Sequence, residues 1–278
     1  RGEKQAGRKE STINQLANSM VTLTRNYRFG DNSGIDPLCQ AIRTGDGEGV
    51  LQLLQRGTYS HIRFTPLKEI TDLKQSLSAT EVVNVYRKAM SEPLPFASLE
   101  AFNQGRILCA IKGGTAGMTS INRTIESILR EEGLVGANRF LYDRRPVIIQ
   151  RNDYSIRLFN GDVGILREDP GDGRLYAHFP AGSQNTRRTL AVRLPDHESA
   201  FAITIHRSQG SEFDHVLVIL PPNPSPILTR ELLYTAVSRA KQSVTIWANP
   251  ETIRWACNRQ VRRSSGLSDQ ILRHLSSS

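Results

Sequence analysis

The residues best suited to chemistry lie between positions 201 and 213, in the string FAITIHRSQGSEF. The pattern predicts a strand that brings Thr204 and His206 to its carboxyl end, where α/β proteins place ligands. Because the two residues are two apart on a strand, their side chains should leave the same face. A hydroxyl and an imidazole can donate hydrogen bonds to phosphate oxygens. A lone histidine is more commonly structural, so the predicted phosphate contact depends on the whole string.

A second candidate is Arg239, in a helix predicted over 229–241. Arg239 comes three positions after Ala236, which places it near the core-facing side of that helix. A buried cation is costly unless it is paired, so Arg239 is expected to meet a carboxylate or a phosphate. The alternative is a packed stem whose charged head reaches water. The apolar face of the helix consists of Leu232, Leu233, Ala236 and Val237.

Two less specific candidates are Arg28 and Phe159. Arg28 follows the strand-end residue Tyr27 and could present its guanidinium to a phosphate. Phe159 precedes a turn at 160–162 and could stack on a nucleic-acid base. The alternation of Leu158 with Phe159 places one of the two inside, and the favoured interpretation puts Phe159 in the core.

The composition favours a polyanionic partner. The 278 residues include 36 Lys and Arg against 27 Asp and Glu, which gives a net charge of +9 and a pI near 9.8. Such an excess is typical of nucleic-acid-binding proteins, although many basic proteins bind nothing of the kind. No apolar run approaches the ~18 residues of a membrane span and no signal peptide is visible, so a soluble, cytoplasmic protein is expected. The missing initiator Met predicts a fragment of something longer.

The cysteines predict neither a disulfide framework nor a metal site. Cys39, Cys109 and Cys257 are odd in number and widely spaced, with no C-x-x-C pair. Buried, reduced thiols are the expected state.

These candidates would be positioned by alternating strands and helices. Alternation before residue 146 and after residue 200 predicts an α/β fold with a parallel sheet and crossover helices. Short strands between these positions, separated by turn signals, predict a small inserted β-barrel. The expected strands are 107–111, 146–150, 164–167, 175–179, 189–194, 201–205, 216–220 and 243–248. The expected helices include residues 35–42, 50–54, 82–89, 121–129, 229–241 and 250–262. A capping box at 78–81 is expected to open the helix that includes 82–89. Residues 65–77 are expected to form a loop.

Three segments, in this order, resemble motifs IV, V and VI of superfamily 1 helicases. They are LTRNYR around Arg28, the string at 201–213, and LTRELLYTAVSRAK around Arg239. Together with the apolar strand before the Asn122 helix and the string RNDYSIRLFNGDVGI, the match resembles the C-terminal part of the RecD family, the alpha subunits of exodeoxyribonuclease V (RecBCD). The resemblance runs from about residue 20 to the end and is densest over 146–241.

This resemblance implies a specific architecture. Residues 1–145 and 200–278 would form the second RecA-like helicase motor domain, a parallel sheet with flanking helices, and 146–199 an inserted SH3-like β-barrel. In such helicases the first motor domain holds ATP and Mg²⁺ on a G-x-x-x-x-G-K-[ST] loop, and that string does not occur in this chain. ATP and Mg²⁺ would therefore be bound mostly outside it.

The helicase motifs imply a role for each candidate residue. Arg28 and Arg239 match arginines that reach the γ-phosphate and act as catalytic arginine fingers. Glu212 matches the acidic residue of motif V that binds the nucleotide ribose, and Thr204 and His206 match residues that touch the backbone of single-stranded DNA.

The implied function is an ATP-dependent DNA helicase that moves 5′ to 3′ on single-stranded DNA, with RecB- and RecC-type partner subunits, in double-strand break repair and recombination. The chain by itself is expected not to hydrolyse ATP, because it lacks the phosphate-binding loop. Two alternatives stay open: a free-standing RecD-like helicase, and a non-enzymatic DNA-binding or scaffold module.

Overall fold

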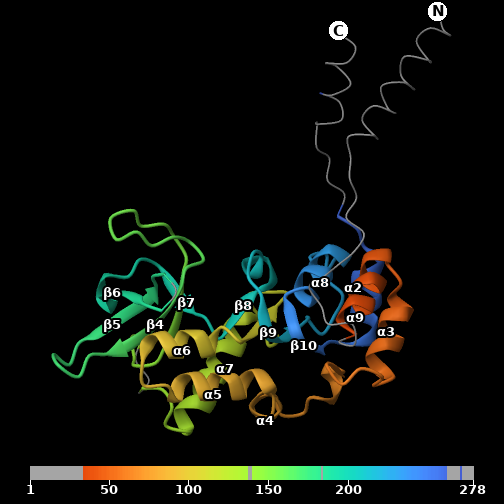
Figure 1. Cartoon of the computed structure of the whole chain (residues 1–278). Helices are drawn as coiled ribbons and strands as arrows, with labels where there is room; N and C mark the ends of the chain where they lie inside the picture. Colours follow the sequence, from red (N-terminus) through yellow and green to blue (C-terminus); the bar gives the residue numbers. More distant parts are fainter. Residues whose placement is uncertain (1–33, 137–139, 183, 262–269, 271–278) are drawn as a thin grey trace, which may run out of the picture.

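The computed structural model describes residues 34–136, 140–182, 184–261 and 270. Within these residues the chain builds two five-stranded sheets (Figure 1). The first sheet is parallel throughout, with the order β1-β10-β9-β2-β8. Its strands are β1 (Ile62–Thr65), β2 (Gly105–Cys109), β8 (Ala202–Thr204), β9 (Phe213–Ile219) and β10 (Ala240–Trp247).

Helices cover both faces of the parallel sheet, as parallel strands require of their crossover connections. They are α2 (Ile35–Thr44), α3 (Gly47–Gln55), α4 (Leu73–Ser78), α5 (Glu81–Ser91), α6 (Pro95–Phe102), α7 (Met118–Glu131), α8 (Arg230–Val237) and α9 (Pro250–Asn258). The group α4, α5, α6 and α7 lies along one side, where α5 contacts β2 and α7 contacts β8 (Figure 1). The group α2, α3, α8 and α9 forms the other layer, where α2 contacts β10 and α8 contacts β9.

The predicted apolar faces account for these helices. The face of α2, made of Ile35, Leu38, Cys39 and Ile42, is at most 3% exposed. The face of α7 carries Ile121, Ile125, Ile128 and Leu129, all buried. Burial of one such aliphatic side chain contributes roughly 1.5–3 kcal/mol, so each face anchors its helix on the sheet. The predicted continuous apolar strand is confirmed as β2, whose five residues are all buried.

The parallel strands give the sheet one edge of carboxyl ends and one edge of amino ends. Thr204 is the last residue of β8 and pairs with Cys109 at the carboxyl edge. Phe213 is the first residue of β9 and pairs with Ala240 at the amino edge. The short helix η3 (Ile205–Ser208) starts the return of the chain from one edge to the other.

The second sheet is antiparallel and comes from residues 146–199, here called the antiparallel module. Its order is β6-β5-β4-β3-β7, with β6 and β7 at the two edges. The strands are β3 (Pro146–Ile149), β4 (Val163–Glu168), β5 (Leu175–Pro180), β6 (Thr186–Leu190) and β7 (His197–Ser199). Ile148 and Ile165 join the core of the parallel domain, whereas Val147, Ile149 and Phe179 belong to a separate small core. The module therefore packs against the parallel domain through one of its faces.

Several short elements differ from the expectation. The supposed loop at 65–77 contains α4, and both β1 and α6 were not predicted. The capping box at 78–81 is wrong, because Ser78 ends α4 and Thr80 caps α5 by accepting a hydrogen bond from Val83 N at 3.4 Å. These elements are too short to show a clear apolar period; β1, for example, buries only Ile62.

Two predicted boundaries are displaced by tertiary pairing. The helix expected over 229–241 ends at Val237, because Ala240 already pairs with Phe213 in the sheet. The strand expected over 189–194 ends at Leu190 and is followed by a short 3₁₀ helix. The helical and strand patterns predicted before residue 34 lie outside the described residues.

The three cysteines are buried and form no disulfide within the described part of the chain. Burial raises the pKa of the Cys257 thiol to about 11. None of the helices that the structure describes is both long and apolar enough to cross a membrane.

Candidate functional site

Arg239 lies in the turn between α8 and β10, where three hydrogen bonds hold its side chain. Nε donates to Thr235 O at 3.2 Å and one Nη donates to Ser211 O at 3.0 Å. The other Nη donates to Ser238 Oγ at 3.3 Å, and the carbonyl oxygen of Arg239 accepts from Phe213 N at 2.9 Å. The described partners are thus carbonyl oxygens and a hydroxyl, and the half-buried guanidinium is anchored to the segment that precedes β9.

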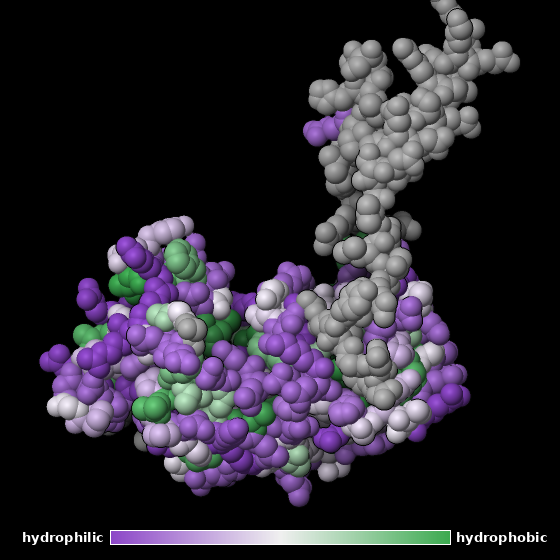
Figure 2. Space-filling view, viewed as in Figure 1, coloured by the Kyte–Doolittle hydropathy of each residue, from purple (hydrophilic) through white to green (hydrophobic). Residues whose placement is uncertain are grey.

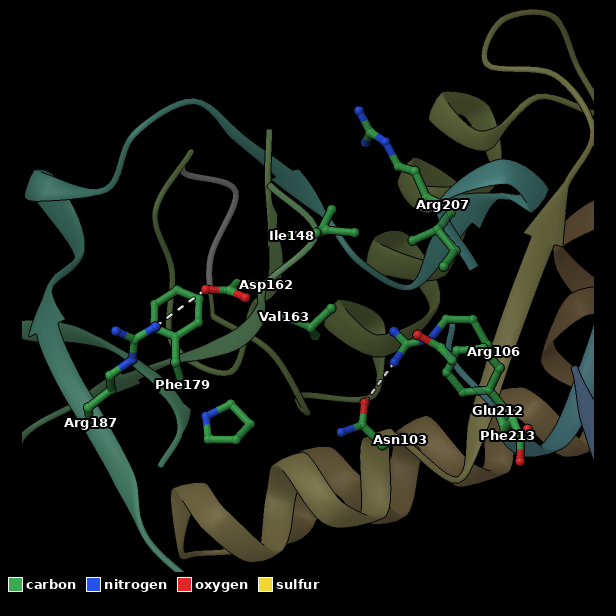
Figure 3. Close-up of a pocket in the computed structure, with 14 residues that line it drawn as sticks. Asn103, Arg106, Ile148, Asp162, Val163, Phe179, Arg187, Arg207, Glu212 and Phe213 are labelled. Atoms are coloured by element: carbon green, nitrogen blue, oxygen red, sulfur yellow. Dashed lines mark hydrogen bonds and ion pairs between the residues drawn. The ribbon is translucent and has the colours of Figure 1, made fainter. Parts of the chain in front are cut away.

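Glu212 lies between the two residues that bond to Arg239. Its side chain is half-buried and contributes to the wall of a pocket (Figure 3). Because Glu212 directly precedes β9 and Arg239 directly precedes β10, both residues lie at the amino edge of the parallel sheet. The structure therefore places at one edge of the sheet two residues that the sequence separates by 26 intervening residues.

Thr204 and His206 lie at the opposite edge of the sheet. Thr204 is half-buried at the end of β8, and His206 is exposed in η3. The prediction that one strand presents both on the same face is wrong, because the strand stops at Thr204 and the chain turns into a 3₁₀ helix. The exposure of His206 leaves its imidazole accessible to a ligand.

Phe159 is 45% exposed, so the expectation that it fills the core of the module is wrong. Leu158 is 1% exposed and takes the inward position. The ring of Phe159 packs edge-to-face against Tyr154, with centroids 6.0 Å apart, and Tyr154 is 76% exposed. Hydrophobic colour interrupts the hydrophilic surface over the end of the module that bears this loop (Figure 2).

The loop that carries these two rings is held by hydrogen bonds within the loop and by an arginine of β6. Asp153 Oδ1 accepts from Ser155 N at 2.9 Å, and Asp162 Oδ2 accepts from Phe159 N at 3.0 Å. Arg187, on β6, donates to Arg157 O and forms an ion pair with Asp162 at 3.3 Å. Tyr154 was not singled out from the sequence; its place five residues after the end of β3, in a polar string, was the available signal.

A pocket of about 430 Å³ lies between the parallel sheet and the antiparallel module. Asn103, Arg106 and Glu212 line it from the parallel domain, and Phe179 and Arg187 from the module (Figure 3). The sequence did not indicate Arg106, which precedes the predicted strand. Arg28 lies outside the described residues, so its position relative to Arg239 is not described.

The side-chain chemistry of the described residues bears on which ligands could bind here. Arg239 and Glu212 supply one cation and one carboxylate, which suit a phosphate and a ribose hydroxyl. Within the described residues no group of three or more His, Cys, Asp or Glu side chains is placed to hold a metal ion.

Comparison with known proteins first gives the class. Residues 199–247 match the model of the UvrD-like helicase C-terminal domain, which covers β8, η3, β9, α8 and β10. The chain therefore has the helicase RecA-like α/β fold with a parallel sheet.

Three relatives match over larger parts of the chain. The chain is 35% identical to the RecBCD enzyme subunit RecD of Mycobacterium tuberculosis, over 89% of this chain and 42% of that protein. It is 31% identical to RecD of Haemophilus influenzae, over 91% of this chain and 41% of that protein. It is 29% identical to the ATP-dependent RecD2 DNA helicase of Deinococcus radiodurans, over 61% of this chain and 24% of that protein. The resemblance to RecD is confirmed, and the chain spans about two fifths of the length of the RecD relatives.

Proposed function

We propose that this chain is the C-terminal motor region of an ATP-dependent DNA helicase subunit of the RecD type, which moves 5′ to 3′ on single-stranded DNA. The observation that carries the proposal is the bonding of Arg239 to Ser211 and Phe213, the two neighbours of Glu212, at one edge of a helicase fold. The similarity to RecD subunits supports the same assignment.

In this proposal the chain supplies one side of a composite ATP site. Arg239, and Arg28 from the part outside the described residues, are the arginines that stabilise charge on the transferred phosphoryl group. Glu212 accepts a hydrogen bond from the ribose. ATP and Mg²⁺ are held mainly by a first motor domain, because the string G-x-x-x-x-G-K-[ST] does not occur here.

Single-stranded DNA would pass along the carboxyl edge of the sheet. Thr204 and the exposed imidazole of His206 can donate hydrogen bonds to its backbone there. Phe159, with Tyr154 beside it, offers exposed rings on which bases could stack. The net charge of +9 favours a polyanionic partner of this kind.

We further propose that residues 1–145 and 200–278 form one discontinuous RecA-like domain and that 146–199 form an SH3-like β-barrel. The order of the five antiparallel strands supports the second assignment. The partners would be RecB- and RecC-type subunits, and the role would be double-strand break repair and recombination in the cytoplasm. The buried cysteines without disulfides are compatible with such a reducing compartment.

The proposal is tested by comparing ATP hydrolysis of the isolated chain with that of the full-length subunit. We expect no DNA-stimulated hydrolysis from the pure chain, because β- and γ-phosphates have no cradle. The full-length subunit should hydrolyse ATP and respond to single-stranded DNA. Turnover by the isolated chain that survives removal of contaminating ATPases would contradict the proposal, as would a full-length subunit without DNA-stimulated hydrolysis.

A free-standing RecD-like helicase is the second candidate, and the similarity to RecD2 favours it. Co-purification of the full-length subunit with RecB- and RecC-type proteins separates the two. Stable association supports the RecD assignment, and unwinding of DNA by the subunit alone without such association supports the alternative.

A further inference from the structure

A buried arginine lines the pocket that Glu212 also lines, near the amino edge of the parallel sheet. Arg106, on β2, is 1% exposed although arginine is among the residues least often fully buried. Its guanidinium carbon lies 4.2 Å from the ring centroid of Phe102 and 4.9 Å from that of Phe213. One Nη donates to Ala200 O at 2.7 Å and the other donates to Asn103 Oδ1 at 2.9 Å.

The partners of Arg106 are neutral. Among the described residues no carboxylate forms an ion pair with it, and Nε has no hydrogen-bond partner. Burial lowers the pKa of Arg106 to about 10, which reflects the desolvation of its charge. A buried cation without a carboxylate is costly, and an apolar side chain of similar length would fill the same space at lower cost. Packing alone therefore does not explain an arginine at this position.

The guanidinium of Arg106 contacts two segments, each of which leads to one candidate site: it donates to Ala200 O and lies over the ring of Phe213. Ala200 is the residue at which the antiparallel module returns to the parallel sheet, two residues before β8 and four before Thr204. Phe213 directly follows Glu212, and its amide donates to the carbonyl of Arg239 at 2.9 Å. Both contacts lie at the amino edge of the sheet. One guanidinium contacts Ala200, from which β8 runs to Thr204 at the carboxyl edge, and also Phe213, which directly follows Glu212.

We propose that Arg106 is a positioning residue that couples the two edges: by holding Ala200 O and the Phe213 ring together, it fixes segment 199–204 relative to segment 211–213. This inference rests on the proposed function. When DNA displaces the Thr204 end of β8, the planar guanidinium transmits the displacement to the residues that flank Glu212. A guanidinium suits this task because its several donors lie in one rigid plane, whereas an ammonium makes point contacts.

The test uses the full-length subunit with Arg106→Met, which keeps the length and apolar stem and removes the donors. We expect DNA stimulation of ATP hydrolysis to fall about tenfold, within the usual range of coupling between sites. The KM for ATP without DNA and the Kd for an oligo-dT strand should each stay within about threefold of wild type. Arg56→Met is the matched control, because Arg56 is exposed at the end of α3.

Two further variants keep the test decisive if Arg106→Met folds poorly. Arg106→Lys keeps the charge but replaces the planar, forked guanidinium by a compact ammonium, so it should retain only part of the stimulation. Phe213→Leu keeps an apolar side chain and removes the ring that the guanidinium of Arg106 lies over, and it should also reduce stimulation. Circular dichroism and thermal unfolding establish the folded fraction of each variant.

The outcomes separate this inference from the proposed function. A wild-type subunit without DNA-stimulated hydrolysis would overturn the proposed function itself. A stimulated wild type together with folded Arg106→Met and Phe213→Leu variants of normal stimulation would overturn the inference alone. An equal loss of basal and stimulated rates would also overturn it, because that pattern indicates a purely structural residue.

Discussion

Arg239 donates a guanidinium hydrogen bond to Ser211 O at 3.0 Å. The carbonyl oxygen of Arg239 also accepts the amide of Phe213 at 2.9 Å, so one residue holds both neighbours of Glu212. The guanidinium of Arg239 is therefore held next to the backbone segment that carries Glu212. Such preorganised charge is effective in phosphoryl transfer, where the protein acts mainly by positioning and by stabilising charge.

In the full-length subunit, Arg239→Ala should reduce ATP hydrolysis on the order of 10³-fold and leave nucleotide affinity within a few-fold. The reason is that arginine fingers act on the transition state more than on the bound ground state. Steady-state hydrolysis and equilibrium binding of a fluorescent ATP analogue measure the two effects. Arg43→Ala, at an exposed position of α2, is the matched control. Near-normal turnover in Arg239→Ala would remove this residue from the catalytic role.

The joint replacement Thr204→Ala/His206→Ala should weaken binding of single-stranded DNA about ten- to a hundredfold. Each side chain would lose one hydrogen bond to the DNA backbone, worth about 1 kcal/mol after the exchange with water. Fluorescence anisotropy with an oligo-dT strand at fixed salt measures the change, and basal nucleotide affinity should stay near normal. Thr58→Ala/His61→Ala is the matched control, because these residues have the same types and are exposed at the start of β1. Unchanged DNA affinity would show that motif V does not contact the strand.

Glu132→Gln should make the free energy of unfolding depend less on pH in the acid range. Both carboxylate oxygens of Glu132 accept hydrogen bonds from Arg87, at 2.9 and 2.7 Å, and these bonds lower the pKa of Glu132. A lowered pKa contributes stability above the unfolded-state value of 4.5, and that contribution is lost as pH falls through the folded-state pKa. The pair is partly exposed, so its contribution near neutral pH is below about 1 kcal/mol.

Urea unfolding of wild type and Glu132→Gln at several pH values between 3 and 7 measures this contribution. The difference in unfolding free energy should be largest near pH 6 and should shrink toward pH 3. The exposed Glu100 on α6 provides the control variant Glu100→Gln. A difference that stays constant over the whole range would show that the charge on Glu132 is not the cause.

The alternation of strands and helices was predictable from the sequence because long apolar elements show their period. The strands of the parallel sheet that carry long apolar runs, β2, β9 and β10, were predicted for this reason. The four-residue β1 was missed, because only Ile62 of its residues is buried and so no period is visible. The end of α8 was misplaced because Ala240 pairs with Phe213 in the sheet. Helix propensity depends on neighbouring residues and does not reveal such long-range pairing.

The residues of the candidate site that belong to a sequence motif could be predicted. Those whose role depends on contacts between distant parts of the chain could not. Glu212 and Arg239 were indicated from strings, but their joining through Ser211 and Phe213 required the fold. Arg106 gave no signal, since its partner Ala200 is 94 residues away. The choice between Leu158 and Phe159 was made the wrong way, because alternation states that one points inward without stating which.

The exposed pair Tyr154 and Phe159 should contribute to binding of single-stranded DNA through base stacking. Replacement of either ring by Ala should weaken binding of an oligo-dT strand by about 1–3 kcal/mol, or roughly five- to 150-fold, because every base offers a face for stacking. The two rings pack on each other, so the double variant should lose less than the sum of the two single losses.

Trp255→Ala replaces an exposed aromatic residue on α9 and should leave the affinity unchanged. Leu158→Ala serves as a structural control, because removing this buried side chain should lower stability by roughly 2–5 kcal/mol and leave the affinity of the folded fraction near normal. Normal DNA affinity in a folded Tyr154→Ala/Phe159→Ala chain would show that this loop serves another partner.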